Sequence, residues 1–285
     1  MSAPAPSTSL PKALRIVIIG AGPAARCLVR QLDRARFAGS ITVLSNRDDT
    51  PEELLELALL PGVSVRFGQP ASHIDPASRT VTTADGLEFA YDQLVIATGS
   101  ATVSRPVEGA GHCLSYSTID DAVRIADAVG DVTRQLGRRP LGILVGTGAA
   151  AGQAEAVLRS KGVRPVRTTA RPAAVVPGPS AGLAASGVIF EDGSRMNGDL
   201  VVLAEERQAL DGLAAGAGLR TAAAGGIVID KDFRTSVPDI WALGDAAAFD
   251  GVRLGLLVAA GSAAGACASR LLTAVSAAPD LDFAA

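Results

Sequence analysis

The sequence predicts an α/β fold in which parallel strands alternate with helices. A run of branched apolar residues that ends in glycine, at 14–20, leads into a helical pattern, and 139–162 repeats this order of strand, glycine turn and helix. A further apolar strand follows the first helix at 40–46, and a right-handed crossover makes it parallel to the first strand. Two strand–turn–helix units of the same kind therefore organise the chain.

The remaining patterns fill in the elements between and after these units. Thr-Pro before a Glu/Leu-rich stretch predicts a short helix within 47–60, with Thr50 or a neighbour as its cap. The segments from 63 to 96 alternate like an antiparallel flap that returns to a buried strand, and 118–136 predicts a helix. An Asp-Gly turn predicts a hairpin before a buried strand ending near Ala204, and the last buried strand ends at Gly244 and Asp245.

Composition excludes several classes of protein. The 285 residues, 48% apolar, can bury the core of one large domain or of two interleaved small ones. A net charge of -3 without charge blocks argues against nucleic acid and membrane-surface partners. Residues 1–12 lack the pattern of a signal peptide and predict a disordered lead-in, and 254–269 is too short and too broken by Gly and Ser for a membrane span. A cytoplasmic protein with a buried C-terminal helix is expected.

Cysteines and histidines give no sign of a metal or disulfide centre. The three cysteines are far apart, without metal-ligand or redox spacing, and Cys27 falls within the first predicted helix as a packing residue. The two histidines, His73 and His112, lie outside the glycine turns, where surface or packing roles are expected. The sequence predicts no metal site and no disulfide chemistry.

The first glycine cluster has the pattern G-x-G-x-x-A between a strand and a helix. Gly20 permits a tight turn, Gly22 leaves room for a pyrophosphate against the backbone, and the helix amides then face its negative charge. In this context the pattern predicts a dinucleotide site rather than a plain turn. The acidic residue that usually binds the ribose is replaced by Asn46, followed by Arg47, so weaker adenosine binding is expected.

Two later segments, YDQLVIATGS (91–100) and TSVPDIWALGDAA (235–247), resemble further fingerprints of the pyridine nucleotide-disulfide oxidoreductase superfamily. Within it the chain is similar to the N-terminal reductase part of nitrite reductase large subunits and to rubredoxin reductase-like proteins, from residue 14 to about 275 with gaps. The resemblance implies FAD, with the Ala-Thr-Gly turn beside it and the carboxylate of Asp245 bonded to its ribityl chain. The implied FAD residues are Gly20, Gly22, Pro23, Ala24, Asn46, Arg47, Ala71, Ala97, Thr98, Gly99, Gly244 and Asp245.

The resemblance also implies an NAD(P) site at the second glycine cluster. Its residues would be Gly146, Gly148, Gln153 and Arg171, with Gln153 at a position where relatives usually carry Glu near the nicotinamide. No acidic residue ends the next strand, and Arg167 and Arg171 either meet a 2'-phosphate, favouring NADPH over NADH, or are solvated surface arginines. Glu205 and Glu206 stand where close backbone approach is usual. Whether this domain still binds its cofactor stays open.

The predicted organisation is a Rossmann-like FAD domain of residues 13–118 and 236–285, with an inserted, shortened NAD(P)-type domain at 119–235. The segment 47–62 is shorter than the family segment that covers the flavin. The resemblance implies an FAD-dependent NAD(P)H oxidoreductase of bacterial type, with a small-molecule or protein electron acceptor. The acceptor, the catalytic residues, and a homodimer or partner subunit stay open. Two alternatives remain: a biosynthetic flavoenzyme that does not use NAD(P)H, and a degenerate nucleotide-binding subunit without catalysis.

Overall fold

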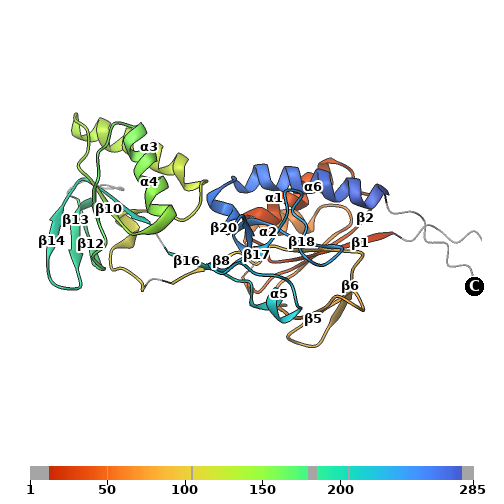
Figure 1. Cartoon of the computed structure of the whole chain (residues 1–285). Helices are drawn as coiled ribbons and strands as arrows, with labels where there is room; N and C mark the ends of the chain where they lie inside the picture. The colour runs from red at the N-terminus through yellow and green to blue at the C-terminus, as the bar shows by residue number, and fades with distance from the viewer. Residues whose placement is uncertain (1–12, 50, 104, 179–184, 205, 278–285) are drawn as a thin grey trace, which may run out of the picture.

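The computed structural model describes residues 13–49, 51–103, 105–178, 185–204 and 206–277. The expected lead-in 1–12, the cap Thr50 and Glu205 lie outside these residues. Within them the chain forms two units side by side, each built on a parallel sheet (Figure 1). This agrees with the α/β fold expected from the alternation of apolar strands and helical patterns.

The first unit is built on a five-stranded sheet whose strands all run parallel. Its order is β18 (Ile240–Ala242), β7 (Gln93–Ile96), β1 (Leu14–Ile19), β2 (Gly39–Leu44), β3 (Val63–Arg66). The central strand β1 buries its last four residues, as the run LRIVII predicts for a strand covered on both faces. Helices α1 (Pro23–Arg34) and α6 (Ala260–Ala277) lie together on one face (Figure 1).

Smaller elements complete this unit on both faces of the sheet and at its edges. Helix α2 (Glu52–Ala58) leads into β3, and β4 (Ala71–Asp75), β5 (Thr80–Thr83) and β6 (Glu88–Ala90) form an antiparallel sheet. The prediction that the antiparallel flap begins at residue 63 is wrong. Residues 63–66 pair parallel with β2, because α2 brings the chain back across the sheet before β3 begins. Helix α2 begins after Pro51, and no side chain caps it.

The second unit is built on a four-stranded parallel sheet. Its order is β11 (Val166–Thr168), β10 (Gly142–Val145), β15 (Leu200–Ala204), β9 (Leu114–Tyr116). Leu144 and Val202 face helices α3 (Asp121–Leu136) and α4 (Gly148–Ser160). The alternate residues face an antiparallel sheet of β12 (Pro172–Pro177), β13 (Ala185–Phe190) and β14 (Arg195–Asn197). Strand β11 is short and lies at the edge of the sheet, and Pro165 directly before it has no N–H to donate to a neighbouring strand.

The sheets divide the chain differently from the predicted insertion of 119–235. The second unit already begins at β9 and its last strand is β15, so its sheets span 114–204. Beyond it, β16 (Arg207–Ala209) pairs with β8 (Ser100–Thr102), and β17 (Ile227–Val228) pairs with β19 (Ala247–Phe249). Helix α5 (Gly212–Gly216) packs into the core of the first unit. Residues 207–235 therefore belong with the first unit by pairing and packing.

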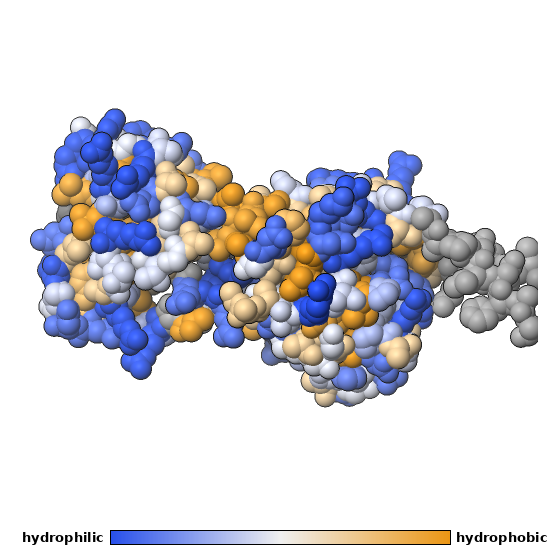
Figure 2. Space-filling model, viewed as in Figure 1, coloured by the Kyte–Doolittle hydropathy of each residue, from blue (hydrophilic) through white to orange (hydrophobic). Residues whose placement is uncertain are grey.

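Hydrogen bonds join the two units between residues 117–121 and 253–260. Ile119 N–H donates to the Gly255 carbonyl at 2.8 Å, and Ala260 N–H donates to Asp120 Oδ2 at 3.0 Å. Figure 2 shows hydrophobic side chains gathered where the units meet, and Ile119 and Leu257 are both partly exposed. The short helix η3 (Leu254–Leu256) and the expected C-terminal helix thus form one side of this junction.

Candidate functional site

The first glycine turn passes directly against the turn that follows β7. Gly20 has φ +104°, and its N–H donates to the Leu44 carbonyl at 2.8 Å. A β-carbon at Gly20 would collide with the carbonyl oxygen of Ala97 and lie 2.7 Å from its carbonyl carbon. Only glycine has both the backbone freedom and the absence of a side chain that this crossing requires.

The N-terminus of α1 is open to an anion. Gly22 precedes the helix with φ -71°, Pro23 opens its first turn, no side chain caps it, and its first turn carries no acidic residue. A β-carbon at Gly22 would meet nothing within 4 Å. The free N–H groups and positive end of the helix dipole therefore face space that the chain leaves empty, which fits a phosphate.

Two further predicted segments meet the glycine turn from other strands. Thr98 Oγ1 donates to the Leu210 carbonyl at 2.6 Å, Leu210 N–H donates to the Gly99 carbonyl at 2.9 Å, and Gly99 has φ +76°. These bonds fix the Ala97–Gly99 turn against Leu210, the residue that follows β16. On the other side a β-carbon at Gly244 would lie 2.8 Å from the Ala24 side chain. The structure thus brings Gly20, Ala24, Ala97 and Gly244 to one edge of the sheet.

Asn46 and Arg47 follow β2, and both are exposed. The Arg47 guanidinium binds both oxygens of Asp49, at 2.7 and 2.5 Å, and this bond lowers the pKa of the Asp49 carboxyl. Arg47 N–H donates to the buried Ser45 hydroxyl at 3.1 Å, and Ala71 opens β4. Contact of Asn46, Arg47 and Ala71 with an adenosine stays a prediction.

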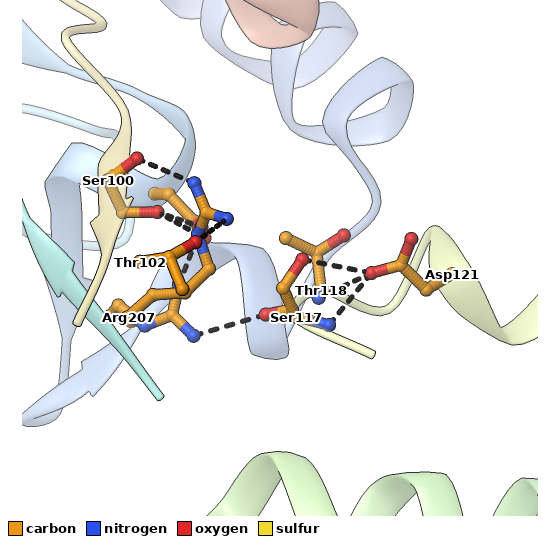
Figure 3. Close-up of polar contacts among 8 residues, drawn as sticks. Ser100, Thr102, Ser117, Thr118, Asp121 and Arg207 are labelled. Atoms are coloured by element: carbon orange, nitrogen blue, oxygen red, sulfur yellow. Dashed lines mark hydrogen bonds and ion pairs between the residues drawn. The ribbon is translucent and has the colours of Figure 1, made fainter. Parts of the chain in front are cut away.

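Asp245 lies in the short helix η2 (Gly244–Ala246), because the last buried strand already ends at Ala242. Its Oδ2 accepts hydrogen bonds from Arg253 Nη1 at 2.5 Å and Ser100 Oγ at 2.7 Å. Arg207 bonds to Ser100 and Thr102 (Figure 3). Its Nε is 3.9 Å from the same Oδ2 of Asp245. In this conformation the carboxylate expected to bind a ribityl chain is held by the chain's own cations.

Sequence reasoning did not find Arg253, Ser100 or Arg207. Arg253 follows the Gly244-Asp245 fingerprint by eight residues, while Ser100 and Arg207 come from paired strands far apart in sequence. No spacing rule links these three positions. A basic residue close behind the fingerprint aspartate was the one available signal.

The residues present fit FAD in part. The space at Gly22 and the uncapped helix N-terminus fit its diphosphate. Asp245, by contrast, has its Oδ2 engaged by Arg253 and Ser100, and its Oδ1 is buried without a hydrogen-bond partner among the described residues.

The second glycine turn repeats the first. Gly146 has φ +140°, and a β-carbon there would lie 2.6 Å from the Ala204 carbonyl oxygen and 2.8 Å from the Ala204 side chain. Gly148 has φ +69° and opens α4 with no side-chain cap, no acidic residue in the first turn, and no atom within 4 Å of a β-carbon position. At the end of β15, Ala204 is therefore the residue that lies close to Gly146, and the glutamates come after it in the sequence.

A cavity of about 660 Å³ lies beside this turn. Its wall includes Thr147 from the turn, Arg105 and Arg171 as cations, and Glu191 and Glu206 as anions. Arg167 has other partners: its Nη1 is 3.5 Å from Glu155 Oε2, and its Nε donates to the Gly146 carbonyl at 3.5 Å. Of the two arginines considered for a 2'-phosphate, Arg171 is the one that lines the cavity.

Gln153 connects the two units. Tyr116 Oη donates to Gln153 Oε1 at 3.1 Å, and Gln153 Nε2 donates to the Leu256 carbonyl at 2.8 Å. Burial, and then the charge of Asp121, raise the pKa of the Tyr116 phenol. A role of Gln153 beside a nicotinamide stays a prediction, because in this conformation both ends of its amide are engaged within the chain.

None of the three cysteines forms a disulfide, and two of them, Cys113 and Cys267, are buried. Burial raises the pKa of the Cys267 thiol to about 12, so it stays protonated and unreactive at neutral pH. Among the described residues there is no group of three or more His, Cys, Asp or Glu side chains that could hold a metal. In the same part of the chain, no helix is long and apolar enough to cross a membrane.

Two overlapping stretches, residues 14–151 and 138–266, match the family model described as pyridine nucleotide-disulphide oxidoreductase. Together they cover most of the chain, including both glycine turns. The chain belongs to this family. The resemblance read from the three fingerprints is confirmed, and so is the two-Rossmann-domain fold. The family consists of NAD(P)H-dependent flavin oxidoreductases.

Two relatives illustrate how distant the similarity is, and both are longer than this chain. The chain is 28% identical over 226 residues to the nitrite reductase [NAD(P)H] large subunit of Klebsiella oxytoca, covering 69% of this chain and 23% of that protein. It is 29% identical over 274 residues to a probable ferredoxin reductase of Castellaniella defragrans, covering 81% and 67%. The chain therefore spans about a quarter of its nitrite reductase relatives and about two thirds of the ferredoxin reductase.

Solved structures of the same fold include putidaredoxin reductase in a covalent complex with putidaredoxin. It has a TM-score of 0.57 at 22% identity, over 92% of this chain and 76% of that one. A ferredoxin reductase from Rhodopseudomonas palustris has a TM-score of 0.52 at 24% identity, over 90% and 76%. These likenesses support the fold.

Proposed function

We propose that this chain binds FAD at the first glycine turn and NAD(P)H at the second, and passes electrons to an acceptor. The observation that carries the proposal is the repeated geometry of the two turns. At each turn, a glycine lies so close to a neighbouring backbone that a side chain there would collide with it. The helix that follows has no side-chain cap, and the space before its N-terminus is open. Two anion-binding helix ends in one chain suit two dinucleotides.

In this proposal each unit binds one diphosphate through the N–H groups at the start of its helix, α1 or α4. Bound FAD would supply the redox chemistry, with NAD(P)H as the source of electrons. The chain orients the two cofactors and excludes water, with Gln153 and Tyr116 holding the units together at the junction. Several relatives are named ferredoxin–NAD(+) reductase components, so a small redox protein is our proposed class of acceptor.

The absorption spectrum of the purified protein tests the flavin. We expect an oxidised flavin band near about 450 nm, at least after incubation with FAD. NADPH or NADH added without oxygen should then bleach it. A flavin band that neither nucleotide bleaches would favour a flavoenzyme reduced by another substrate, the alternative that the engaged Gln153 amide favours. A protein that takes up no flavin would contradict the proposal and favour a non-catalytic subunit.

Substitution of Arg171 tests the nicotinamide cofactor. Arg171 lines the cavity beside Gly146, and loss of a charge-assisted bond to a 2'-phosphate weakens binding by about tenfold or more. For Arg171→Ala we therefore expect the KM for NADPH to rise about tenfold while that for NADH stays within about twofold. Arg159→Ala is the matched control, because Arg159 pairs with Glu155 at 2.6 Å and does not line the cavity. Equal losses with both nucleotides would show that Arg171 does not read the 2'-phosphate.

A further inference from the structure

The environment of Asp245 leaves neither carboxylate oxygen available to a ligand. Oδ2 already accepts bonds from Arg253 and Ser100. Oδ1 is buried and points at Gly255, where a β-carbon would collide with it and would lie 3.2 Å from the Thr118 methyl group. The chain's own atoms therefore enclose both oxygens.

Arg253 is the main partner in this arrangement. Its side chain is 10% exposed, and Asp245 is 11% exposed. A second bond, from Arg253 Nη2 to the Ser117 carbonyl at 3.1 Å, fixes the guanidinium from the other side. Arg207 lies farther from Oδ2, at 3.9 Å, and bonds to Ser100 and Thr102. Removing Arg253 therefore takes away the closest charge that holds Asp245 in place.

The Arg253–Asp245 pair also reaches the junction between the units. Ser117, whose carbonyl Arg253 binds, donates its own N–H and hydroxyl to Asp121 Oδ2, at 2.8 and 3.0 Å, just before α3 (Figure 3). The position of Asp245 is thus tied to the start of the second unit.

We propose that Arg253, as a positioning residue, keeps the Asp245 carboxylate bonded to the chain's own groups and closed to a ribityl chain, and so sets the affinity for flavin. The inference rests on the proposed binding of FAD. Flavin that bonds to Asp245 selects the minority of molecules in which the Arg253–Asp245 pair is open. The apparent dissociation constant is then raised by the inverse of that open fraction.

The unpartnered Oδ1 explains why the pair can open. A buried oxygen that accepts no hydrogen bond destabilises the closed arrangement. A ligand hydroxyl that donates to Oδ1 would therefore offset part of the free energy that is lost when the Arg253–Asp245 bond breaks. Gly255 permits the closed arrangement, because any side chain there would push Asp245 out. Arg253 therefore stabilises the closed state through its charge, and Gly255 allows it by leaving room for the Asp245 carboxylate.

The test is FAD binding by the full apo chain, titrated by quenching of flavin fluorescence. Arg253→Met keeps an apolar side chain and removes the charge, and Gly255→Ala displaces Asp245 without changing any charge. For each we expect FAD to bind about tenfold more tightly than to the wild type. Arg15→Met is the matched control, because Arg15 pairs with Asp92 at 3.0 Å elsewhere in the same unit. Its flavin affinity should be unchanged.

The outcomes separate this inference from the proposed function. Tighter FAD binding by Arg253→Met or Gly255→Ala than by the wild type supports the inference. FAD binding that is detectable in a variant but not in the wild type supports it too. If the wild type binds FAD and the folded variants bind it equally or more weakly, Arg253 does not hold the site closed, and the flavin proposal stands. If no protein binds FAD, both fail. Thermal unfolding of each apo protein identifies which variants are folded.

Discussion

Gly20→Ala should destabilise the first unit by about 3–5 kcal/mol, the largest effect that we expect from any single substitution here. The new β-carbon collides with the Ala97 carbonyl, which is backbone and cannot rotate away, and φ +104° is strained for any residue with a β-carbon. Since whole domains are stable by only about 5–15 kcal/mol, much of the folded population would be lost at moderate temperature.

Urea denaturation followed by tryptophan fluorescence measures this, because the single tryptophan, Trp241, lies in β18 of the same sheet. Gly130→Ala is the matched control. Gly130 is exposed within α3, a β-carbon there meets nothing within 4 Å, and alanine should stabilise that helix by up to about 1 kcal/mol. A Gly20→Ala protein as stable as the wild type would contradict the close crossing of the two turns.

Gly22→Ala should leave the fold intact and weaken FAD binding by about 30-fold or more. The β-carbon would point into open space at an ordinary φ of -71°, so the cost to the apo protein should stay below about 1 kcal/mol. A bound diphosphate would meet the methyl group and lose close contact with the helix N–H groups. The loss of one or two charge-assisted hydrogen bonds is worth about 2 kcal/mol or more.

Thermal unfolding and FAD titration of the same Gly22→Ala preparation separate the two quantities. We expect Gly20→Ala to lower the stability of the protein, and Gly22→Ala to lower its affinity for FAD. The two glycines, although only two residues apart, would then have different roles. Unchanged FAD affinity in a folded Gly22→Ala protein would place the diphosphate elsewhere and remove the main support for the proposed function.

Local sequence was enough to predict the glycine turns and their strands. Branched apolar runs form buried parallel strands, and Gly20 and Gly146 are required by backbone geometry at the turns themselves. The close approach of Ala97 to Gly20 depends on the fold, whereas the strands and the positive φ at each glycine depend on residues close together in the chain. For the same reason the helices α1, α3 and α4 fall close to where the patterns predicted them.

Local sequence did not predict which strands pair or where the two units begin and end. Residues 63–66 alternate like a flap strand, yet pair parallel with β2, since pairing depends on where α2 returns the chain. Residues 207–235 follow the second unit in sequence, yet pack against the first through β16 and α5. Alternation of side chains carries no information about strand direction, which is decided by tertiary contacts.

The sequence by itself determined that two helix N-termini, each preceded by a glycine turn, are present, and it placed Asp245 close to the end of a buried strand, which the structure ends three residues earlier, at Ala242. Only the tertiary structure decided what Asp245 touches, because Ser100, Arg207 and Arg253 reach it from separate strands and loops. A buried carboxylate must be paired with hydrogen-bond donors or cations, and folding decides which of them lie near it. Charge interactions depend on distance in space and not on separation along the chain.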